Sequence, residues 1–171
     1  TFAFLKIENA AALREAFSGS QLGQLIADPA MKPLKDDVAA KLKEATEEVR
    51  ARIGLSLEEL VRLPQGEISL ALVTTEGAAQ PVALLVAADA GRNEEEMSEL
   101  MAKLTELAKG EGKAKVTTEE FAGATLTVIK PDNADEDDPP VIWTKRGTVF
   151  HIGSSVEALK DALSKADGRD D

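Results

Sequence analysis

The 171-residue sequence contains no cysteine, no tyrosine, one histidine and one tryptophan. Without cysteine there is no disulfide framework, no Cys₄ zinc site, no thiol nucleophile and no iron–sulfur cluster. With one imidazole and no phenol, carboxylates and lysines are the main side chains left for general acid–base chemistry. The residue types therefore exclude most of the common catalytic classes.

Positive charge is also scarce, because 20 Lys+Arg stand against 31 Asp+Glu and the formal net charge is −11. Nucleic-acid phosphates and anionic membrane surfaces repel such a chain. Aromatic residues make up 4% of the chain, which leaves few of them to stack on bases. The longest apolar run, Val82 to Ala88, is far short of the roughly 20 residues of a transmembrane helix. We expect no nucleic-acid partner and no membrane insertion by this segment.

The spacing of apolar residues alternates between a helical and a strand period. Helices are predicted over 10–17, 21–27, 33–53, 57–63, 94–109 and 155–165. Asn9, Asn93 and Ser154 are the predicted N-caps of the first, fifth and last of these helices. Strands are predicted over 2–7, 68–72, 81–88, 113–121, 124–130, 141–144 and 148–152. This order predicts an α+β fold, a mostly antiparallel sheet of about five to seven strands with helices packed on one face.

The same patterns predict the domain boundary, the core and one hairpin register. Residues 1–166 are expected to form a single α+β domain, a fragment of a longer protein, and residues 167–171 a polar tail or linker start. A two-residue loop at Arg146-Gly147 would place Trp143 opposite Phe150 and His151 opposite Ile142. The predicted core residues are Leu5, Leu42, Val49, Leu70, Leu84, Val86, Leu100, Leu104, Leu126, Val128, Trp143, Phe150 and Leu159.

His151 and the serines that follow it are the first candidate site. A single histidine cannot make a zinc site without other strong ligands, and we interpret His151 as a partly exposed strand residue. Ser154 fits better as the N-cap of the last helix than as a nucleophile. The turn Gly153-Ser154-Ser155 could offer N–H groups to an anion, but we interpret it as a capped helix start without a ligand.

Two acidic runs are the other candidates. Glu94-Glu95-Glu96 lies in a first helical turn, where the helix dipole favours carboxylates without any catalytic role. The run 132–138 holds four Asp and one Glu. It lacks the ligand spacing of an EF-hand, so we expect a mobile, ligand-free loop that is dispensable for folding, with a hard-cation site as the alternative. We predict no catalytic, cofactor-binding or metal-binding residue and no cofactor.

Several longer motifs carry a family resemblance. They are Phe2–Asn9 (FAFLKIEN), Leu22–Ala30 (LGQLIADPA), Leu55–Leu60 (LSLEEL), Leu63–Ala71 (LPQGEISLA) and Phe121–Leu126 (FAGATL). In this order they resemble an uncharacterised family of long bacterial extracytoplasmic proteins, a domain of unknown function. The resemblance implies an exported location and a piece of a larger protein, and it supplies no catalytic residues.

The functional interpretation that follows is a non-catalytic binding or scaffolding domain of an exported bacterial cell-envelope protein, periplasmic, envelope-bound or secreted. Its partner would be another protein or other domains of the same chain. One alternative is a hydrolase that uses carboxylates alone, which needs two facing acidic side chains in a cleft. The other alternative is a cytoplasmic regulatory module.

Overall fold

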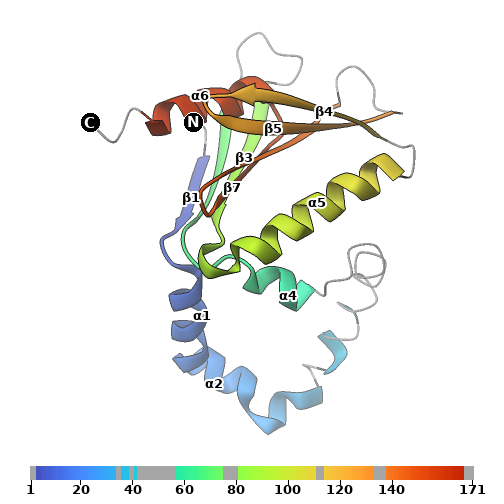
Figure 1. The fold of residues 1–171 in the computed structure, drawn as a ribbon. Helices are drawn as coiled ribbons and strands as arrows, with labels where there is room; N and C mark the ends of the chain where they lie inside the picture. The colour runs from blue at the N-terminus through green and yellow to red at the C-terminus, as the bar shows by residue number, and fades with distance from the viewer. Residues whose placement is uncertain are drawn as a thin grey trace.

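The computed structural model describes residues 3–33, 36–38, 41, 57–74, 81–110, 114–132 and 138–167 (Figure 1). The elements in these ranges are β1 Ala3–Ile7, α1 Ala10–Gly19, α2 Gln21–Ala27, η1 Pro29–Met31, α4 Leu57–Arg62, β2 Ile68–Thr74, β3 Val82–Asp89, η2 Gly91–Asn93, α5 Glu94–Gly110, β4 Ala114–Phe121, β5 Ala124–Pro131, β6 Val141–Arg146, β7 Val149–Gly153 and α6 Val156–Asp167.

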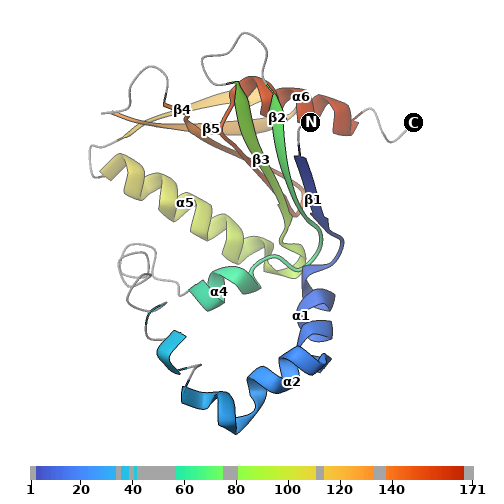
Figure 2. The same ribbon diagram turned by 180° about the vertical axis from the view of Figure 1, so that it is seen from behind.

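One antiparallel sheet organises the molecule. Its seven strands follow the order β1-β2-β3-β7-β6-β5-β4, and each strand pairs antiparallel with its neighbours. The predicted α+β class and the predicted strand number are confirmed. In both views α1 and α2 run away from the sheet; we call this pair the N-terminal arm (Figures 1 and 2).

Helices cover both faces of the sheet, whereas the sequence predicted helices on one face. On one face Phe150 packs with Leu100 of α5 and with Leu63, and Trp143 lies against this cluster. On the other face Ile142 packs with Leu159 of α6. Because neighbouring strand residues point to opposite faces, Ile142 and Trp143 place α6 and α5 on opposite sides. No helix among the described residues is long and apolar enough to cross a membrane.

A hydrogen bond fixes α5 against the sheet. The Trp143 Nε1–H donates to Thr105 Oγ1 at 3.1 Å, and the Thr105 hydroxyl donates to the carbonyl of Met101 at 2.8 Å. Thr105 is buried, so its hydroxyl and the indole N–H satisfy each other inside the core.

The β6–β7 hairpin has a different register from the predicted one. Trp143 lies opposite Ile152 instead of Phe150, and His151 lies opposite Thr144 instead of Ile142. The loop is 147–148, with Gly147 at its first position and a φ of 55°. A two-residue hairpin loop favours glycine where φ is positive, so β6 continues one residue beyond the predicted turn.

The predicted core is confirmed in its centre and wrong at its edge. Leu100, Leu126, Phe150 and Leu159 are buried. Leu70, Val86, Leu104, Val128 and Trp143 are partly buried. Leu5 is 60% exposed and Leu84 is 40% exposed. Both lie in the β1–β3 half of the sheet, whereas α5 packs mainly along β4 and β5.

The long helix predicted over 33–53 falls mostly outside the described residues. Residues 33, 36–38 and 41 are helical. The predicted core residues Leu42 and Val49 lie outside the described residues, and that part of the expectation stays a prediction.

A short turn, residues 63–66, joins the arm, α4 and the sheet. The Gln65 and Gly66 N–H groups both donate to the Asp89 carbonyl, at 2.9 and 3.0 Å. The Gly66 carbonyl in turn accepts from Ala10 N at 2.8 Å, and the Gln65 carbonyl accepts from Ala11 N at 3.2 Å. These are N–H groups of the first turn of α1, which have no partner within their own helix. The 63–66 turn therefore fixes the start of the arm to the end of β3.

The cap of α1 completes this junction. Asn9 Oδ1 accepts from Ala12 N at 2.7 Å, as the sequence predicted for an N-cap. With Ala10 and Ala11 bound to the 63–66 turn, all three N–H groups at the start of the helix have a partner.

Substitution of Gly66 tests this junction. A Cβ at this position would lie 2.1 Å from Asp89 Oδ2, while Asp89 Oδ1 accepts from Gly91 N at 2.9 Å. We expect Gly66→Ala to displace Asp89 and to lower the free energy of unfolding by about 1–3 kcal/mol, measured by urea denaturation.

Gly110→Ala is the matched control, because a Cβ there meets open space at the end of α5. It should leave stability unchanged or raise it by up to about 1 kcal/mol. Equal effects of the two substitutions would contradict the role given to Gly66.

Candidate functional site

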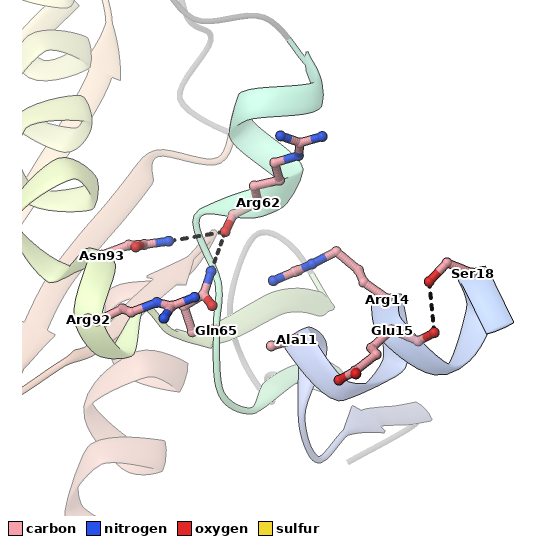
Figure 3. Close-up of a pocket in the computed structure, with 8 residues that line it drawn as sticks. All are labelled: Ala11, Arg14, Glu15, Ser18, Arg62, Gln65, Arg92 and Asn93. Atoms are coloured by element: carbon pink, nitrogen blue, oxygen red, sulfur yellow. Dashed lines mark hydrogen bonds between the residues drawn. The ribbon is translucent and has the colours of Figure 1, made fainter.

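A cleft of about 660 Å³ lies between α1, α4 and η2 (Figure 3). Its walls combine three arginines with amide, hydroxyl and carboxylate side chains. The lining residues are Ala11, Arg14, Glu15, Ser18, Arg62, Gln65, Arg92 and Asn93. We call this the arginine cleft.

Arg14 stands at the α1 side of the arginine cleft and is held by backbone carbonyls. Its Nη1 donates to the Val61 carbonyl at 3.1 Å and its Nη2 to the Pro64 carbonyl at 2.9 Å. These carbonyls belong to the end of α4 and the turn that follows, where a cation is favourable. A guanidinium has five N–H donors, so these two bonds leave donors for a ligand.

The opposite wall is built on the carbonyls that follow α4. The Arg62 carbonyl accepts from Gln65 Nε2 at 2.7 Å and from Asn93 Nδ2 at 3.2 Å. Asn93 Nδ2 also lies 3.2 Å from the Leu63 carbonyl. Asn93 was predicted as a helix N-cap, and its amide instead ties the start of α5 to α4. This fixes the segment that carries Arg92.

The charge of the arginine cleft is opposite to that of the chain. Three of the seven arginines line it, against one carboxylate, in a chain of net charge −11. Arg92 is exposed, and its guanidinium has no hydrogen bond or ion pair to another residue within the described ranges. The guanidinium groups of Arg14 and Arg92 supply charge and directional donors for a carboxylate or a phosphate, whereas the guanidinium of Arg62 points away from these two (Figure 3).

A second hollow of about 610 Å³ shares Arg92 with the arginine cleft, and its charges are balanced. Glu94 and Glu95 line it together with Arg92 and Lys145. Lys145 Nζ forms an ion pair with Glu94 and lies 3.3 Å from Ser98 Oγ. Glu94, predicted to serve the helix dipole, therefore also pairs with β6. Because its positive and negative charges cancel, this hollow attracts an anion less strongly than the arginine cleft does.

His151 does not line either hollow. It lies on β7 between Thr144 of β6 and Ala87 of β3, and it is partly buried. Burial, and in second place the positive charge of Arg146, lower the pKa of His151 below its ordinary value of 6.5. Both causes favour the neutral form of the imidazole.

The N-cap of α6 is Ser155, whereas the sequence predicted Ser154. Ser155 Oγ accepts from Ala158 N at 3.3 Å, so Ser155 and not Ser154 caps α6. Ser154 Oγ accepts from Leu84 N at 2.9 Å and ties the start of α6 to β3. The helix begins one residue later than predicted because the first serine is used by the neighbouring strand.

The acidic run is described only at its ends. Asp132 and Asp138 are exposed, and residues 133–137 lie outside the described residues. Within the described ranges no three His, Cys, Asp or Glu residues gather as metal ligands would. The mobile-loop expectation and its cation-site alternative stay predictions.

Sequence reasoning missed the arginine cleft. Arg14, Arg62 and Arg92 come from three separate elements and follow no spacing that a motif could record. The sequence feature that lies nearest to the cleft is the Leu63–Ala71 motif. Its Gln65 and Gly66 form the backbone hydrogen bonds of the junction beside the cleft.

Comparison with known proteins gives one match. The profile of a family described as "Protein of unknown function (DUF3352)" matches residues 11–148, which is most of the chain. Four of the five motifs noted above lie within the matched range. No curated protein and no solved structure matches the chain significantly.

The lowered pKa of His151 predicts a pH dependence of stability. The unfolded chain binds the histidine proton at a higher pH than the folded chain. The contribution of His151 to the free energy of unfolding is therefore fully present above about pH 6.5, the pKa of the unfolded chain. It is lost as the pH falls toward and through the lower pKa of the folded protein. Urea unfolding between about pH 7.5 and about pH 5.5 should show a larger loss for the wild type than for His151→Gln. Equal losses for the two proteins would contradict this.

Proposed function

We propose that this chain, which belongs to the family described as "Protein of unknown function (DUF3352)", is a non-catalytic binding domain whose arginine cleft takes an anionic group. The observation that carries the proposal is the gathering of Arg14, Arg62 and Arg92 around one hollow in a strongly acidic chain. The chemical class of the ligand is a carboxylate or a phosphate, as on an acidic protein segment or a phosphorylated molecule.

The local charge makes this site selective. An acidic chain as a whole repels anions, whereas cations outnumber carboxylates in the lining of this cleft and attract them. Arg14 and the 63–66 turn hold the cleft walls together through backbone carbonyls, so the site is organised before a ligand arrives. Arg92 has no competing partner within the described ranges and is the residue we expect a ligand to engage first.

The chemistry of the lining supports binding rather than turnover. Guanidinium groups stay protonated and do not exchange protons at neutral pH. Glu15 is the one acidic side chain among the lining residues, whereas a carboxylate-only hydrolase uses a pair.

We propose further that the domain works outside the cytoplasm, as part of an exported bacterial cell-envelope protein. This rests on the resemblance of its motifs to those of long extracytoplasmic proteins. A chain without cysteine suits an oxidising compartment but does not require one. In this setting the anionic partner is another protein or another domain of the same chain.

Titration with inorganic phosphate and with a capped tetra-aspartate peptide tests the cleft. Calorimetry should detect binding of at least one probe that weakens as salt is raised, since the charges are near the surface. Arg92→Ala should weaken that binding about three- to tenfold, the latter equivalent to about 1.4 kcal/mol. Glu15→Gln should strengthen it, because it removes the negative charge in the lining.

Lys115→Ala is the control for net charge. It removes one positive charge, as Arg92→Ala does, but from the exposed β4 strand outside the cleft. Binding should stay within about twofold of the wild type, because an exposed distant charge is screened. The proposal fails if neither probe binds, or if Lys115→Ala and Arg92→Ala weaken binding equally.

A further inference from the structure

The polar contacts that hold the N-terminal arm to the rest of the molecule gather near the start of α1. The first turn of α1 donates two backbone N–H groups to the 63–66 turn, and the Arg14 guanidinium donates to the carbonyls of Val61 and Pro64. Within the described residues, no hydrogen bond or ion pair joins positions 15–27 to α4, to that turn or to the sheet. Beyond this attachment the arm runs away from the sheet in both views (Figures 1 and 2).

Apolar burial adds little to this attachment. Ala10 and Gly23 are the buried residues of α1 and α2, whereas Leu13 and Phe17 are exposed. Among the described residues, neither apolar cluster that packs on the sheet includes a member of the arm. Because apolar burial supplies most of the local stability, an element with little of it opens at a lower free energy than the strands. We therefore expect the junction between the arm and the 63–66 turn to open before the sheet unfolds.

The arginine cleft lies across this junction. Arg14 lines the cleft from α1, and Arg92 lines it from η2, which follows β3 (Figure 3). Their two positive charges therefore stand at one hollow but belong to two parts of the molecule that separate when the junction opens. An anion bound by both guanidinium groups offsets their mutual repulsion and contacts both parts at once.

We propose, on the basis of the anion binding proposed above, that anion binding and closure of this junction are one linked equilibrium. An anion held by Arg14 and Arg92 together fastens the N-terminal arm to the end of β3. A ligand that binds the closed form alone stabilises that form by RT ln(1 + [L]/Kd). The linkage is reciprocal, so the anion has its full affinity only while the junction is closed. The position of the arm is thus what the anion controls.

Native-state hydrogen exchange with and without inorganic phosphate tests this linkage. The Ala10 and Ala11 amides report the junction, because their hydrogen bonds cross from the arm to the 63–66 turn. The amides of β6 and β7 are the reference, since each of these strands pairs on both sides and exchanges through global unfolding. If calorimetry shows that only the tetra-aspartate peptide binds, that peptide replaces phosphate. The sample without either anion receives sodium chloride to the same ionic strength, so that screening is equal.

The two sets of amides should differ without the anion and respond equally to it. In sodium chloride alone, Ala10 and Ala11 should be protected at least about tenfold less than the β6 and β7 amides, because the junction opens before the sheet unfolds. Phosphate at about 30 times its dissociation constant should slow exchange of both sets about 30-fold. That factor is 1 + [L]/Kd, which applies when neither the open form nor the unfolded chain binds the anion.

Arg92→Ala separates binding in the cleft from a general effect of phosphate on stability. At the same phosphate concentration this variant should lose about three- to tenfold of the added protection at Ala10 and Ala11, the factor by which its dissociation constant rises. Lys115→Ala, which removes a positive charge outside the cleft, should keep the added protection within about twofold of the wild type. Protected β6 and β7 amides show that both variants fold. Equal added protection in Arg92→Ala and the wild type overturns the proposal.

The exchange pattern distinguishes failure of the linkage from failure of anion binding. If the anion slows the β6 and β7 amides but not Ala10 and Ala11, it binds without closing the junction, so the linkage is wrong and the anion site stands. Junction amides that match the reference amides in sodium chloride alone also overturn the linkage, because the junction then has no separate opening. If the anion slows neither set and calorimetry detects no binding, both proposals fail.

Discussion

The hydrogen bonds between the 63–66 turn and the end of β3 are the constraint on which the rest of the structure depends. One carbonyl, that of Asp89, accepts from both Gln65 and Gly66. The carbonyls of these same two residues accept from the first turn of α1. A buried or half-buried backbone group without a partner is costly, so this chain of donors and acceptors resists the loss of any one member. The glycine is needed because Asp89 occupies the space of a Cβ.

This junction explains why charged residues from distant parts of the sequence meet. It sets α1 beside the end of α4, and Arg14 reaches the carbonyls of Val61 and Pro64 from there. It also sets the end of β3 beside α4, which brings Arg92 into the same hollow. The anion-binding function that we propose therefore follows from a backbone arrangement. The hydrogen bonds of the turn set the positions of the elements that carry the arginines.

The sequence predicted what local patterns determine. The stripe of apolar residues predicted α5, alternation predicted the strands, and Asn9 was correctly predicted as a cap because its signal lies within four residues. The arginine cleft was not predictable, since its three arginines share no spacing and meet through tertiary structure. The exposure of Leu5 and Leu84 was missed for a similar reason. An apolar side chain in a strand predicts a core position, but strand order and helix placement decide whether anything covers it.

Native-state hydrogen exchange tests the central role of the 63–66 turn most directly. The amides of Ala10, Gln65 and Gly66 should exchange together with the amide of Asp89, with opening free energies that agree within about 1 kcal/mol, because they belong to one cooperative unit. Denaturant should lower all four opening free energies in parallel. The account is contradicted if the Ala10 amide exchanges freely while those of Gln65 and Gly66 remain protected, because the arm would then open without disturbing the turn.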